Sequence, residues 1–170
     1  DPEALQAGMS NMGAWLKENS EAVAEGYQLT DLTTEAVESI PEDCPAEETI
    51  GAGAAFKVHY PIEEFIEVAL AHDPMEVYEG SFGYNDRVFV EDLDCFVEQT
   101  CERTEYHSHI ENQLPLSIEL EVWMVTQIRW IETENGSSAL FRSWMSAPAV
   151  SSLDWIQINQ QYGIGTVFST

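Results

Sequence analysis

The longest regular pattern in the chain runs from Leu114 to Ile131, where apolar and polar positions alternate. The positions on one side are apolar except for a single threonine: Leu116, Ile118, Leu120, Val122, Met124, Thr126, Ile128 and Trp130. A period of two residues is typical of a strand with one buried face. At about 3.4 Å per residue, sixteen residues of such a strand would run roughly 54 Å, several times the usual length. We therefore expect a strongly bent antiparallel sheet built around it.

Shorter β-type runs surround this long strand. They cover 51–60, 75–82, 87–97 and 104–110 before it, and 138–145, 153–159 and 164–169 after it. The Asn135-Gly136 pair predicts a tight hairpin after the long strand, because Asn-Gly favours the positive φ that such turns need. These runs predict an antiparallel meander.

Helical spacing of apolar residues is confined to the first part of the chain. It predicts a helix over 2–19 and another over 62–70, which starts after Pro61 and ends at His72-Asp73-Pro74. Threonines before Ala36 predict a short capped helix near 30–40. No helix is expected after residue 74. The fold class is therefore α+β, with N-terminal helices followed by a long, curved antiparallel sheet.

A proline-rich acidic loop at 40–49 sets the expected domain boundary. Residues 1–50 would form an N-terminal helical segment with an acidic linker, and residues 51–170 an α+β sheet domain. We expect the two parts to form one structural unit.

The segment VHYPIEEFIEVALAHDP (Val58–Pro74), followed by a meander, resembles the opening of the START-like (helix-grip, SRPBCC) superfamily. That resemblance implies a curved sheet that grips helices around an apolar cavity. The chain departs from the superfamily because it ends on a strand-like segment and lacks the long C-terminal helix, so the N-terminal helix would take that place. The element order is also similar to the cone-shaped nuclear-transport-factor-2-like fold. Both resemblances imply a pocket between sheet and helices.

Charge narrows the choice of partners. The chain has 31 acidic and 6 basic residues and a formal net charge of -25. Phosphate backbones repel such a polyanion, so we expect no nucleic-acid partner. An acidic surface is typical of proteins from saline surroundings, where salt screens the repulsion, and multivalent cation binding is the alternative. No run approaches the roughly 18 apolar residues of a membrane span.

The N-terminus and the cysteines bear on the compartment. The chain begins at Asp1 without a methionine, which favours a processed, exported product, secreted or periplasmic. On one continuous strand Cys95 and Cys101 would lie about 20 Å apart, whereas a disulfide spans at most about 7 Å between Cα atoms. Either the chain turns between them, or one of them pairs with Cys44.

One cluster has metal-ligand spacing. On a strand, Glu105, His107 and His109 project to the same side, and imidazoles at this spacing can share one metal ion. Zinc would suit such a site, or iron or manganese if oxygen ligands dominate. The alternative is the ordinary polar face of a half-buried sheet. We expect no other cofactor.

Several residues are candidates for ligand binding or catalysis. Aromatic and sulfur side chains on the last strands would make a pocket wall, with Arg129 placed to bind a carboxylate: Trp123, Trp130, Trp144 and Met145. His59 and Tyr60 are weak candidates for a general acid or base. Known catalytic templates such as GxSxG, HExxH and GxGxxG do not occur.

Three hypotheses follow. We favour non-catalytic binding of an apolar or amphipathic small molecule in a pocket between a curved sheet and helices. The first alternative is a cyclase, dehydratase or isomerase that uses His59, Tyr60 and Arg129. The second is a structural protein that assembles as a homo-oligomer through paired strands, with cations bridging its acidic surface.

Overall fold

The computed structural model describes residues 2–29, 49, 51, 53–55, 57–71, 75, 84–133 and 136–168. The chain divides into two compact units, residues 1–59 and 60–170. This division follows His59, whereas the acidic loop suggests one after residue 50. The predicted helix near 30–40, most of the acidic loop and residues 76–82 lie outside the described residues.

The first unit contains helices α1 (Pro2–Glu18) and α2 (Ser20–Ala24) and strands β1 (Tyr27–Gln28) and β2 (Ala54–Ala55). Helix α1 confirms the helix predicted over 2–19. The strand predicted over 51–60 was wrong, because the described residues of that stretch form only β2, which pairs with β1. Glycine and alanine dominate its first half, and both are depleted in strands.

The second unit is built on a six-stranded antiparallel sheet with the order β3-β4-β5-β6-β8, and β7 pairs with β5. The strands are β3 (Tyr84–Phe89), β4 (Arg103–Leu114), β5 (Ile118–Thr133), β6 (Gly136–Met145), β7 (Val150–Ser151) and β8 (Tyr162–Phe168). Its helices include α4 (Ile62–Ala71), α6 (Leu93–Val97) and the 3₁₀ turn η2 (Pro115–Ser117). The α+β fold class is confirmed.

Strand β5 is the predicted long strand, and it is 16 residues long. One of its faces is buried along its length, as the alternation predicts: Leu120, Val122, Met124, Thr126, Ile128 and Trp130. We call this side of the sheet the inner face and the opposite side the outer face. On the outer face Gln127 and Arg129 are exposed, whereas Val125 is buried. The hydrophobic pattern therefore orients the strand correctly, with one exception.

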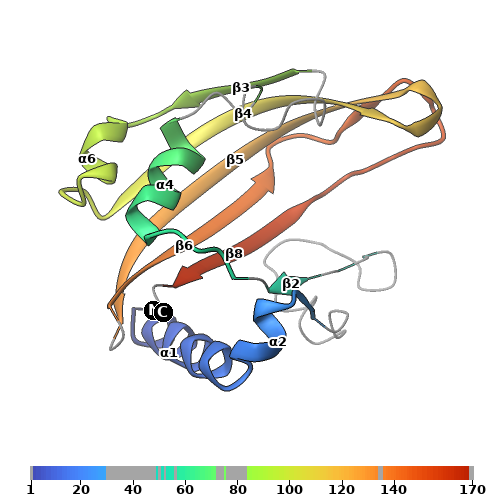
Figure 1. Cartoon of the computed structure of the whole chain (residues 1–170). Helices are drawn as coiled ribbons and strands as arrows, with labels where there is room; N and C mark the ends of the chain where they lie inside the picture. Colours follow the sequence, from blue (N-terminus) through green and yellow to red (C-terminus); the bar gives the residue numbers. More distant parts are fainter. Residues whose placement is uncertain are drawn as a thin grey trace. The chain divides into compact units, whose positions relative to one another are not determined.

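Helices α4 and α6 cover part of the inner face (Figure 1). The cluster between them and the sheet contains Ile62, Ile66, Leu70, Phe96, Ile128, Trp130 and Ala139. A second cluster lies farther along the inner face, where β5 begins: Leu120, Val122, Met124 and Met145. Two separate clusters on one face leave room for a hollow beside them.

Two sequence predictions in this unit were wrong. The run predicted as a strand over 87–97 divides into the end of β3 and helix α6, so a helix does follow residue 74. A carboxylate oxygen of Asp92 accepts a hydrogen bond from the Asp94 backbone N–H at 3.1 Å and caps α6, and Phe96 is fully buried beneath it. Residues 153–159 form turn and coil, and the strand in this region is β7.

The pairing of two cysteines is settled by the turn after α6. Cys95 and Cys101 form a disulfide with their Cα atoms 5.2 Å apart. Gln99 has a φ of 57°, and the Cys101 N–H donates to the Cys95 carbonyl at 2.9 Å. The chain therefore turns between the two cysteines, which was one of the two alternatives.

Candidate ligand-binding site

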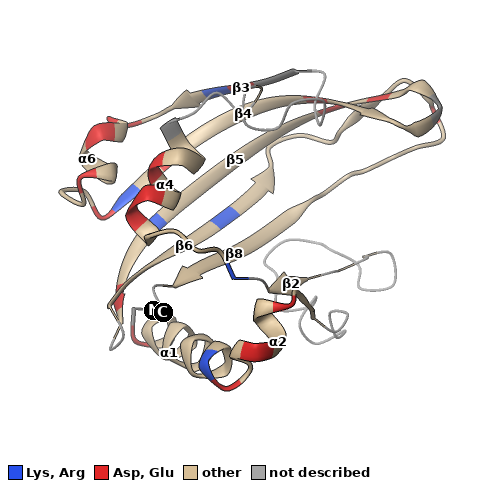
Figure 2. Cartoon of the chain, viewed as in Figure 1, with Lys and Arg blue, Asp and Glu red and all other residues tan. Residues whose placement is uncertain are grey.

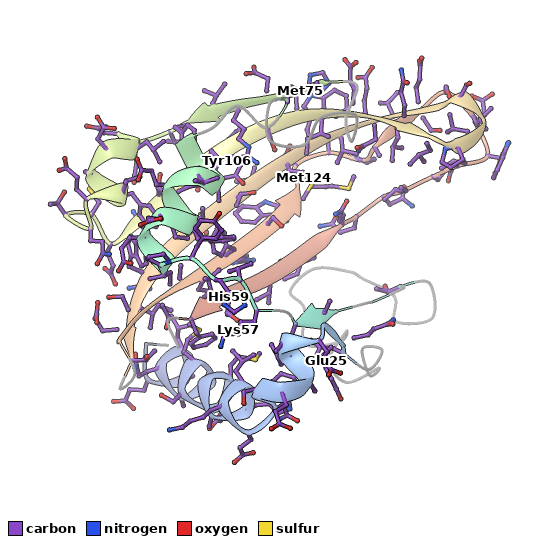
Figure 3. All side chains as sticks on the ribbon, in the orientation of Figure 1. Glu25, Lys57, His59, Met75, Tyr106 and Met124 are labelled. Carbon is purple, nitrogen blue, oxygen red and sulfur yellow. A yellow bond between two sulfur atoms is a disulfide. The ribbon has the colours of Figure 1, made fainter. Side chains whose placement is uncertain are left out.

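The second unit has a pocket of about 280 Å³ on the inner face of the sheet. Its larger lining side chains are Tyr106, Ile110, Val122 and Met124. Its smaller polar side chains are Ser108, Asn112, Thr126 and Ser143, with Gln161 at one side. Arg87 completes the lining. Figure 3 labels Tyr106 and Met124 on the ribbons of β4 and β5.

Small residues in one row across the sheet create this space. Tyr106, Thr126, Ser143 and Gly163 are successive cross-strand partners on β4, β5, β6 and β8. Side-chain size falls along the row, and a Cβ added at Gly163 would lie 2.8 Å from Ser143 Oγ. Side chains pack at close to crystal density, so a row of small residues beside Met124 leaves a hollow unless another element fills it. This row is therefore the structural origin of the pocket.

Arg87 is held firmly at the pocket. Its Nη1 donates a hydrogen bond of 2.7 Å to the carbonyl of Ala69, in the last turn of α4. Its guanidinium carbon lies 4.9 Å from the centre of the Tyr106 ring. A helix C-terminus carries partial negative charge and an aromatic face attracts cations, so both contacts favour the charged guanidinium. The Nε atom is buried and has no hydrogen-bond partner among the described residues.

The charge of this pocket differs from that of the chain. Its described lining contains no Asp or Glu, although the chain carries a formal net charge of -25. Figure 2 shows acidic segments on α4 and α6 and basic segments within the strands of the sheet. The other three arginines, Arg103, Arg129 and Arg142, occupy outer-face positions of the register. The pocket is thus a site of positive charge on an acidic protein.

The structure does not bring the five predicted ligand-binding residues together. Trp130 and Met145 are buried on the inner face but outside the pocket lining. The indole Nε1 of Trp130 donates to the Phe96 carbonyl at 2.9 Å, and the two rings stack with centroids 5.4 Å apart. Trp130 therefore holds α6 against the sheet.

The remaining three predicted residues lie on the outer face. Arg129 donates from Nε to the Glu102 carboxylate at 2.9 Å, which makes a surface ion pair. Trp144 packs beneath the guanidinium of Arg142 at 5.0 Å. Trp123 stacks on the ring of His109 with centroids 5.0 Å apart.

The predicted metal cluster divides into two separate pairs. His107 Nε2 lies 3.1 Å from Glu105 Oε1, and Gln127 donates to the other Glu105 oxygen at 2.7 Å. Hydrogen bonds from Gln127 and then from His107 hold the pKa of the Glu105 carboxyl below its ordinary value. His109 Nε2 instead faces Glu121, at 3.6 Å. Within the described ranges, no three His, Cys, Asp or Glu side chains form a group suited to a metal ion.

The two weak catalytic candidates are on the surface. His59, the last residue of the first unit, is exposed. Tyr60 begins the second unit, is 71% exposed and does not belong to the pocket lining.

Sequence reasoning missed Arg87, Tyr106 and Ser108. One visible sign was Thr126, the single polar residue in the buried alternation of the long strand. The register β4 to β5 then places Tyr106 opposite Thr126, and β3 to β4 places Arg87 opposite Ser108. These registers cannot be read from alternation within one strand.

Comparison with known proteins gives no guide to this site. The chain matches no protein-family model, no curated protein and no solved structure. Among the helices of the described residues, none is long and apolar enough to cross a membrane. The argument for function therefore rests on the geometry of the pocket.

Proposed function

We propose that this chain binds a compact amphipathic small molecule in the inner-face pocket and does not act on it chemically. The observation that carries the proposal is the row from Tyr106 to Gly163, which opens a hollow lined by both apolar and polar side chains. Ligand sites are usually concave and mostly apolar, with a few polar groups that fix orientation. The resemblance to the START-like superfamily points to the same kind of function.

The volume limits the size of the ligand. A pocket of about 280 Å³ lies just below the usual range for small-molecule sites, which begins at about 300 Å³. Benzene occupies an apolar cavity of about 150 Å³, so by proportion this pocket suits roughly a dozen non-hydrogen atoms. Ile110, Val122 and Met124 would bury the apolar part, while Ser108 and Asn112 would meet its polar part.

The lining favours binding over catalysis. Its ionisable side chains among the described residues are Arg87 and Tyr106. The described lining contains no histidine, carboxylate or cysteine, the side chains that most often serve as general acid–base groups or nucleophiles. This lining can hold a ligand in one orientation and shield it from water.

Native mass spectrometry of the purified protein, with and without a chelator, is the first test. We expect extra mass that is released on denaturation as an organic molecule of this size. A second measurement titrates the protein with a panel of compact amphipathic compounds by ligand-observed NMR. Metal-dependent multimers in the first measurement would favour the assembly hypothesis instead.

A matched pair of variants locates the binding. Asn112 lines the pocket, while its neighbour Gln113 is exposed and points to the opposite face of β4. Asn112→Trp should block the pocket and abolish binding, whereas Gln113→Trp should leave binding unchanged. Equal binding by both variants, or no bound compound in wild type, would refute the proposed function.

A further inference from the structure

We infer that the ligand of this pocket is a compact monocarboxylic acid, bound as its carboxylate by Arg87. The inference rests on the proposed function and specifies its ligand. Arg87 is the cationic residue of the lining, and its side chain is fixed by Ala69 and Tyr106 before any ligand arrives. A guanidinium that is already oriented loses little conformational freedom when it binds a carboxylate.

Arg87 differs from Arg103 and Arg129 in having no carboxylate partner among the described residues, and from Arg142 in lying on the inner face, in the pocket. Arg129 pairs with Glu102, and Arg103 acts electrostatically on Glu105. Arg142 lies over the Trp144 ring at 5.0 Å and over the Tyr162 ring at 5.3 Å. No described carboxylate lies within ion-pair distance of Arg87.

This arrangement is unusual for such an acidic chain. Although the chain has 31 acidic residues, the half-buried Arg87 contacts the Ala69 carbonyl and the Tyr106 ring and lies beside small polar side chains. Burial of a charge is costly unless an opposite charge or hydrogen bonds compensate it. A ligand carboxylate in the pocket would supply that compensation, and its attraction to Arg87 would be stronger than in water.

The rest of the lining limits the acid to one charge. Beyond Arg87, the described lining offers hydroxyl, amide and apolar groups, so a second carboxylate would have no cation to meet. The volume leaves room for an apolar body of roughly eight to ten carbon atoms, by the same proportion as above. Medium-chain and phenyl-substituted alkanoic acids have this size and charge.

Isosteric acid–amide pairs test the inference with wild-type protein. Octanoate with octanamide, and 3-phenylpropanoate with 3-phenylpropanamide, match in size and differ in charge. We expect the acid of a pair to bind at least tenfold more tightly than its amide in isothermal titration calorimetry at low salt. The negative net charge of the protein repels a carboxylate, so tighter binding of the acid than of the amide requires a favourable contact within the pocket.

Charge-matched variants identify the residue responsible. Arg87→Gln should remove the preference for the acid, whereas Arg103→Gln, which removes the same charge from an exposed outer-face position, should keep it. If Arg87→Gln proves unstable, Arg87→Lys takes its place in the test. It keeps the charge and should keep only part of the preference for the acid.

The outcomes separate the two proposals. If amides bind as tightly as acids in wild type, the inference is wrong and the proposed function stands. If Arg103→Gln lowers the preference as much as Arg87→Gln, a general surface potential is responsible and the inference is also wrong. If no compound of either kind binds, both proposals fail.

Discussion

The replacement Trp130→Phe tests whether this tryptophan serves the core or the ligand. It removes the indole N–H that donates to the Phe96 carbonyl at 2.9 Å, while a phenyl ring can keep the stack on Phe96. One net hydrogen bond contributes about 1 kcal/mol. The indole has about three more buried ring atoms than phenyl, which adds about 2 kcal/mol of lost apolar burial. We therefore expect the free energy of unfolding to fall by about 3 kcal/mol.

Urea unfolding followed by far-UV circular dichroism measures this loss without relying on tryptophan fluorescence. Trp155→Phe is the control, because Trp155 is 77% exposed and should change stability by less than about 0.5 kcal/mol. Binding of pocket ligands by folded Trp130→Phe should equal that of wild type. If Trp130→Phe is as stable as the control but binds ligands weakly, Trp130 belongs to the site and the structural reasoning is wrong.

Three further predictions concern single groups. Thr104→Val should raise the free energy of unfolding by about 1 kcal/mol in urea titrations, since the Thr104 hydroxyl is buried without a hydrogen-bond partner among the described residues; a loss of stability would show that the hydroxyl is bonded. Removing the disulfide between Cys95 and Cys101, six residues apart, should lower that free energy by about 2 kcal/mol in the same assay; an unchanged urea midpoint would contradict this. Gln127→Ala should raise the pKa of Glu105 towards its ordinary value, measured by NMR titration of the carboxyl carbon; an unshifted titration curve would exclude this hydrogen bond. Because the folded-state pKa of Glu105 is lowered, its interactions stabilise the fold above the ordinary glutamate pKa, and that contribution is lost as the pH falls through the lowered value.

Strand alternation and helical spacing predicted the elements that have a regular period over many residues. The long strand, the strand after it and helix α4 appear close to their predicted bounds. The short elements failed, because their formation depends on contacts outside their own sequence. Helix α6 is five residues long, too short to be stable alone, and it is held by the Asp92 cap, the disulfide and the burial of Phe96.

The candidate site was harder to predict than the fold. The tryptophans and Arg129 are conspicuous in sequence, yet the face on which each lies depends on whether its position along the strand is odd or even. Trp123, Arg129 and Trp144 fall on the outer face. Arg87 lies on a run whose beginning and end were both misplaced, since β3 starts at Tyr84 and ends at Phe89. A one-residue error in register moves a side chain to the other face. Alternation along a strand therefore cannot show which arginine lies in the pocket until the pairing of the strands is known.

The mismatch between helix and strand lengths explains why a pocket exists at all. Helix α4 has 10 residues, and at about 1.5 Å per residue it is roughly 15 Å long. Strand β5 has 16 residues and at about 3.4 Å per residue runs roughly 54 Å. A helix of that length covers only part of the inner face, so the rest must be filled by other side chains or stay hollow. Both lengths follow from the sequence, whereas the row of small residues that keeps the uncovered part open follows only from the strand register.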